Sequence, residues 1–123
     1  MDAIKRENTV SYFADRMTNF QRLAQELAAD DRGDEAVFAM VQMNVYDIFS
    51  TIFSVAVKAS GQDDAKVVQF FLKKIQQIPQ SWHTALCSAE QHGQSEKAHI
   101  ERIKLQTIAG IQKDFEQIWE VSA

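Results

Sequence analysis

Residues that interrupt helices are scarce in this chain, whose 123 residues include one proline and four glycines. Proline removes a backbone donor, and glycine raises the entropic cost of ordering a helix or strand. Three of the glycines, Gly33, Gly61 and Gly93, divide the chain into four pieces of similar length. This scarcity and spacing exclude a fold of short strands and frequent turns, and they favour a few long helices.

Cysteine is also scarce, and the chain has no net positive charge. A single cysteine, Cys87, cannot form a disulfide within the chain, which favours a reducing, cytoplasmic location. The chain has 13 basic and 17 acidic residues and a formal charge of −4. A surface of that sign repels phosphate backbones, so no nucleic-acid partner is expected. The first residues, MDAIKREN, are polar and lack the apolar run of a signal peptide.

Apolar side chains recur at helical spacing in three segments, and in the first two of these the steps alternate between three and four residues. In the segment 2–29 they are Val10, Phe13, Met17, Phe20, Ala24 and Leu27. In the segment 63–92 they are Val68, Phe71, Ile75, Ile78, Trp82, Ala85 and Ala89. In the segment 95–121 the inner stripe is Ile100, Ile103, Ile108, Ile111, Phe115, Ile118 and Val121. Such seams predict amphipathic helices that bury one side.

Polar residues between the seams predict where the helices begin and end. Gly33 is expected to close the first helix in a left-handed conformation, and Asp34 to cap the second, which runs to Ser60. The third helix is expected to begin at residues 63–64, and Ser95 is expected to cap the fourth.

Pro79 lies inside the third seam, whose register continues past it. We therefore expect a helix kinked near Pro79 rather than two separate helices. Short connections between long helices force neighbours to run in opposite directions. The predicted fold is all-α, an antiparallel up-down-up-down four-helix bundle formed as a single domain by residues 1–123.

The second segment is unusual because Asp47 is the only charged side chain between Val37 and Val57. Six polar positions in this stretch make it a poor membrane span, so none is expected. Two interpretations remain open. The helix is either the most buried member of an isolated bundle, or its apolar surface binds a protein, including a second copy in a homodimer. The candidate interface residues are Met40, Met43, Tyr46, Asp47 and Phe53.

A metal site is a weaker hypothesis. Di-iron bundles use two Glu-x-x-His motifs, and this chain has only one, Glu96 to His99, which excludes that dinuclear site. His92, Glu96 and His99 could hold zinc or nickel if the loop before the last helix folded back. Alternatively, Glu96 interacts with the helix dipole and the histidines are solvated. Because this spacing is unspecific, no metal or other cofactor is expected.

A ligand pocket near Pro79 is a further hypothesis. A kink there could open a cavity beside Trp82, where a small apolar molecule would bind. His83 precedes Cys87 by one helical turn, so the two could form a pair, but no orienting group or oxyanion hole can be named. A packed, inert thiol is the simpler interpretation.

These patterns predict a cytoplasmic protein that acts through protein–protein contact, in an adaptor, chaperone or immunity-type role, without catalysis. The alternative is a bundle that binds a small molecule near Trp82, His83 and Cys87, or a metal ion at His92, Glu96 and His99.

Overall fold

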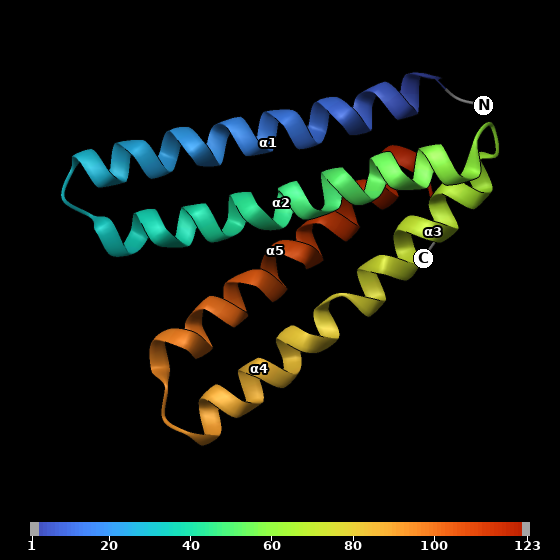
Figure 1. Ribbon diagram of the computed structural model, residues 1–123. Coiled ribbons are helices and arrows are strands. Elements are labelled where there is room, and N and C mark those ends of the chain that lie inside the picture. The colour runs from blue at the N-terminus through green and yellow to red at the C-terminus, as the bar shows by residue number, and fades with distance from the viewer. Residues whose placement is uncertain (1–2, 122–123) are drawn as a thin grey trace.

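The computed structural model describes residues 3–121, which form helices joined by short turns (Figure 1). The helices are α1 (Ala3–Ala29), α2 (Gly33–Ser60), α3 (Asp64–Gln77), α4 (Pro79–Gln91) and α5 (Ser95–Trp119). No strand occurs among the described residues, so the all-α class is confirmed. The predicted start of the first helix at residue 2 lies outside the described residues.

The boundary between α3 and α4 is a single residue, Ile78. Its backbone keeps helical angles (φ −62°, ψ −43°), and its amide donates to the carbonyl of Lys74 at 2.9 Å. Pro79 has no amide to donate, so the ladder of helical hydrogen bonds is interrupted there. In Figure 1, α4 continues roughly in the direction of α3. This arrangement is consistent with one rod kinked near Pro79.

Contacts between the helices are consistent with the up-down-up-down order. α1 packs on α2, α2 on α3, and α4 on α5, while α2 and α5 also touch. Phe53 in α2 contacts Trp119 near the end of α5, and Phe38 in α2 contacts His99 near its start, so these two helices run in the same direction. The α1–α2 and α4–α5 hairpins diverge toward their turns (Figure 1).

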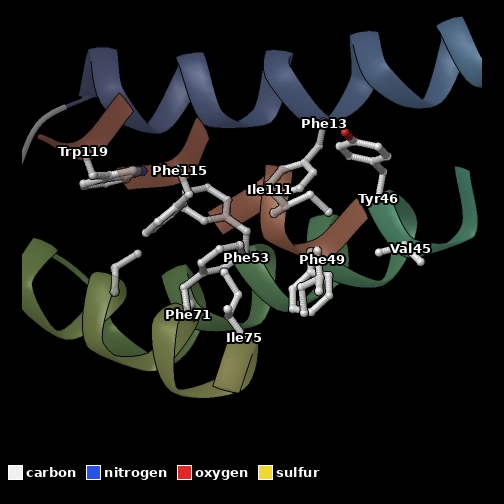
Figure 2. Close-up of a cluster of buried hydrophobic side chains, with 13 residues drawn as sticks. Phe13, Val45, Tyr46, Phe49, Phe53, Phe71, Ile75, Ile111, Phe115 and Trp119 are labelled. Carbon is white, nitrogen blue, oxygen red and sulfur yellow. The ribbon is translucent and has the colours of Figure 1, made fainter. Parts of the chain in front are cut away.

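The core lies where α1, α2, α3 and α5 meet, and it is rich in phenylalanine (Figure 2). Phe71 of α3 is fully buried at its centre. Its ring lies 4.1 Å from that of Phe115, centroid to centroid, and about 6 Å from the rings of Phe13, Phe49 and Phe53. Burial of one such side chain contributes roughly 1.5–3 kcal/mol. Each predicted seam therefore contributes a ring to one shared cluster.

The turn between α1 and α2 differs from the prediction. Asp31 takes the left-handed conformation (φ 58°), and the amide of Arg32 donates to the carbonyl of Leu27 at 2.8 Å. Gly33 is already the first residue of α2, and Asp34 lies in its first turn. The predictions that Gly33 closes the first helix and that Asp34 caps the second are wrong. Aspartate visits the left-handed region more readily than most residues, so the turn closes two positions earlier.

Most of the other helix ends lie within one residue of their predicted positions, but α5 ends at Trp119, two residues before Val121, the last residue of its predicted stripe. Asp63 caps α3 by accepting a hydrogen bond from the amide of Lys66 at 3.3 Å. Gly61 follows the end of α2, as predicted. Ser95, however, is the first residue of α5 rather than its cap, because the cap position falls on Gln94, whose side chain makes no capping bond.

Candidate functional site

The five predicted interface residues of α2 fall into two groups. Tyr46 and Phe53 are 6% and 2% exposed and belong to the core shown in Figure 2. The prediction that they contact a partner is therefore wrong, because both point toward the other helices of the same chain. Met40 and Asp47 are exposed, and Met43 is half-buried. These three remain available as candidates.

The solvent side of α2 has a helical period of its own. Ala39, Tyr46 and Phe53, seven residues apart, are buried. On the opposite side a second seam, again in steps of three and four, consists of Val37, Val41, Asn44, Ile48, Thr51 and Val55. Val37, Ile48 and Val55 are 51%, 40% and 47% exposed. A mainly apolar seam of period 3.5 is typical of a surface that packs against another helix. Here Asn44 and Thr51 are its two polar positions, and no described residue covers the seam fully.

α1 extends this surface with uncharged side chains. They are Val10, Ala14, Thr18, Gln21, Gln25 and Ala28, all exposed. We call these six residues, the seam of α2, Met40 and Asp47 the outer face. Asp47 is the only charged side chain among these residues. The outer face is therefore two helices wide and nearly without charge.

Two hollows lie along the line where α1 and α2 meet on the outer face. One, of about 550 Å³, lies near the α1–α2 turn, where Ala28 and Ala36 leave room beside Val37 and Met40. The other, of about 460 Å³, is lined by Ala14, Thr18 and Met43 among others. Small side chains on both helices produce these hollows, into which larger side chains of another molecule could fit.

On its other side, α1 is fixed to α5 by a polar cluster. The hydroxyl of Tyr12 donates to Asp114 Oδ2 at 2.6 Å, and the guanidinium of Arg16 lies 3.7 Å from the same carboxylate. The same guanidinium lies 5.4 Å from the centre of the Tyr12 ring. Burial, and then the hydrogen bond to Asp114, raises the pKa of Tyr12 well above its usual range. The phenol therefore stays neutral and serves as a structural donor.

A second link joins the start of α1 to the end of α5. Trp119 Nε1 donates to Thr9 Oγ1 at 2.8 Å, and the Thr9 hydroxyl donates to the carbonyl of Lys5 at 2.7 Å. Both Thr9 and Trp119 are buried. Sequence reasoning missed this pair, although Thr9 stands one helical turn before the seam residue Phe13. A hydroxyl on an apolar stripe needs a partner, which was the available signal.

The structure does not bring Trp82, His83 and Cys87 together in a pocket. Trp82 is half-buried against the core, and the ammonium of Lys104 lies 5.8 Å from its ring. His83 and Cys87 are exposed, so the interpretation of Cys87 as a packed thiol is wrong. A hollow of about 440 Å³ between α4 and α5 is lined by Ala85 and other residues, but by none of these three.

His92, Glu96 and His99 do not converge on a metal site either. His92 Nδ1 lies 2.7 Å from the carbonyl oxygen of Ser88. The ring of His99 lies 4.6 Å from that of Phe38, centroid to centroid, with an angle of 80° between the ring planes, and Glu96 lies in the first turn of α5. In the described part of the chain, no three His, Cys, Asp or Glu side chains are grouped to hold a metal ion. The hypothesis of a metal site at these residues is not supported.

α2 meets the length and composition criteria for a membrane span, and it is the one helix in the range 3–121 that does. Its most apolar window has a mean hydropathy of 1.3, and 33% of that window is buried within the chain. A core helix of a soluble protein passes the same test. Because one stripe of α2 packs in the core, this observation carries no membrane assignment.

Comparisons of the chain with protein-family models, curated proteins and solved structures found no match. The helical architecture alone does not assign an activity either, because one fold supports many unrelated functions. A proposal for this protein therefore has to be argued from its own surface.

Proposed function

We propose that this protein acts by non-covalent contact with another polypeptide through the outer face, in an adaptor, chaperone or immunity-type role, without catalysis. One observation carries the proposal: the exposed seam that includes Val37, Ile48 and Val55 on α2. Contiguous apolar surface rimmed by polar residues is typical of protein interaction sites. Isolated exposed apolar residues need no such explanation, but these follow one helical line.

The chemistry of the outer face favours packing over catalysis. Acid–base catalysis and metal binding need several titratable groups, and Asp47 is the only one among the residues of this face. Met40 and the neighbouring Met43 instead offer flexible, polarisable side chains that adapt to a partner's shape. The face is suited to binding a surface, not to transforming a substrate.

Energetics indicate that an interface would use both helices. Covering the remaining exposed parts of Val37, Met40, Ile48 and Val55 contributes roughly 4 kcal/mol, about half of their full burial. Association itself costs on the order of 4–15 kcal/mol in lost freedom of motion. Burial of the α2 seam alone therefore offsets only the lowest estimate of the association cost. We infer that the six exposed α1 residues of the outer face also take part in the contact.

A second candidate is the binding of a small apolar molecule. The hollow of about 550 Å³ beside Val37 and Met40 has the size of many ligand sites. Native mass spectrometry of freshly purified protein would show the added mass of a retained ligand. A bare chain or a bare oligomer would favour protein contact.

The test of the proposed function is site-specific photo-cross-linking in intact host cells. A photoreactive phenylalanine analogue replaces Ile48 on the outer face, and in a matched control it replaces Lys73, which is exposed on α3. We expect the Ile48 probe to capture a polypeptide and the Lys73 probe to capture much less. Equal capture by both probes, or none by either, would show that the outer face is not the contact surface.

A further inference from the structure

We infer that the partner on the outer face is a second copy of this chain, with the two α2 helices antiparallel about a twofold axis. This inference rests on the proposed function and names its partner. Most oligomers are symmetric homo-oligomers, and a twofold axis requires a surface that complements itself. The charges at the two ends of α2 meet that requirement.

Acidic and basic side chains lie at opposite ends of α2. Asp34 and Glu35 are in its first turn, and Lys58 is in its last turn. An antiparallel pair of α2 helices places Lys58 of each copy beside the acidic turn of the other. A parallel pair would place like charges together at both ends. In the antiparallel pair, the partly positive N-terminal end of each α2 helix also lies beside the partly negative C-terminal end of the other, which is favourable.

Charge pairing sets the register. If Lys58 lies opposite Asp34 of the partner subunit, the twofold axis passes near position 46, midway between them. Val37 then lies opposite Val55 of the partner subunit, and these are two of the most exposed apolar side chains of the helix. The same register that pairs the charges therefore also pairs the apolar residues.

The size of the outer face lies close to the lower limit for stable dimers. The seam from Val37 to Val55 is about 27 Å long at ~1.5 Å per residue. Two helices spaced ~8–10 Å apart make the face roughly 20 Å wide, or about 550 Å² per copy. Specific interfaces bury from about 600 to 1,000 Å² per partner, so the face, with both of its helices counted, lies just below the lower end of that range.

Cysteine cross-linking tests the second copy and its direction. In a Cys87→Ser background, V37C and V55C are prepared as separate proteins, and both sites are half-exposed, so folding should persist. A short bismaleimide is added to each protein alone and to their mixture. We expect at least fivefold more cross-linked dimer in the mixture than in either protein alone. A mixture of V37C with Q69C, on exposed α3, gives the background.

Any other outcome of the cross-linking experiment contradicts the inferred antiparallel dimer. Self-cross-linking of V37C as strong as that of the mixture would mean a parallel pair. Background levels in all samples would mean that no second copy binds here. If the photoreactive probe at Ile48 then captures a different polypeptide in cells, the proposed function stands and only the second copy fails. If that probe captures nothing, both fail.

Discussion

Trp119 Nε1 donates a 2.8 Å hydrogen bond to the hydroxyl of Thr9, joining residues 110 positions apart in the chain. Both side chains are buried, so the bond closes the start of α1 onto the end of α5 without competition from water. This bond and the Tyr12–Asp114 bond place α1 firmly over the core. The outer face depends on that placement, since half of it belongs to α1.

Thr9→Val should therefore destabilise the protein. Valine preserves the shape but leaves the indole N–H buried without a partner, which costs about 1–3 kcal/mol. Urea unfolding followed by circular dichroism measures the change. Thr84→Val is the matched control, since Thr84 is exposed on α4 and its hydroxyl donates only to the carbonyl of Gln80 one turn earlier; this change should shift the unfolding free energy by less than about 0.5 kcal/mol. Equal effects of the two changes would contradict the structural role of Thr9.

Tyr12 should make stability sensitive to alkaline pH. Its pKa is raised in the folded state above the ordinary tyrosine value, chiefly by burial and then by the bond to Asp114. The unfolded chain therefore loses the phenol proton first as pH rises, and the contribution of Tyr12 falls above about pH 10. Because the side chain is only half-buried and solvent screens it, the loss is at most roughly 1.4 kcal/mol per pH unit. Urea unfolding of the wild type and Tyr12→Phe at pH 9 and pH 11 measures this loss. Tyr12→Phe should show the smaller decline, and parallel declines would exclude Tyr12 as the cause.

Substitutions at two adjacent residues of α2 should affect different properties, dimerisation at one residue and folding stability at the other. Ile48 lies on the outer face and Phe49 is fully buried. Ile48→Glu should abolish the dimer in light scattering while changing the unfolding free energy of the monomer by less than about 1 kcal/mol. Phe49→Ala should cost about 3–5 kcal/mol of stability by leaving a cavity. An Ile48→Glu protein that remains dimeric would place the interface elsewhere.

The ends of α2 offer a charge-swap experiment. Lys58→Glu should weaken the dimer about tenfold, because it converts two symmetric attractions, each worth roughly 0.35 kcal/mol, into repulsions of similar size, a total change of about 1.4 kcal/mol. Adding Asp34→Lys to that variant should restore most of the affinity. Sedimentation equilibrium at low salt measures both constants. Lack of rescue would show that Lys58 and Asp34 do not meet across the axis.

Asp47 lies near the axis in this register and should limit the affinity. The two Asp47 carboxylates of a dimer approach each other, and like charges in proximity repel. Asp47→Asn should tighten the dimer by roughly threefold, which corresponds to the loss of about 0.6 kcal/mol of repulsion. Sedimentation equilibrium of this variant beside the wild type measures the ratio. A weaker dimer would mean that Asp47 makes a favourable contact instead.

Helix positions could be predicted well from the sequence, and turn details less well. The seams through Phe13, Phe71 and Phe115 predicted helices whose rings now share one core. The left-handed residue of the first turn was missed because Asp31 and Gly33 both suit that conformation by local criteria. The bond between Thr9 and Trp119 was missed because its two halves lie in different helices.

By itself, the sequence determined that this chain is helical and where its helices lie, because periodicity and the scarcity of helix breakers act within single segments. Only the tertiary structure decided which side of α2 faces solvent. Apolar side chains surround most of that helix, so its own pattern does not distinguish Tyr46 and Phe53 from Ile48 and Val55. The packing of α1, α3 and α5, brought together from distant parts of the chain, buries the first two and leaves the second two exposed.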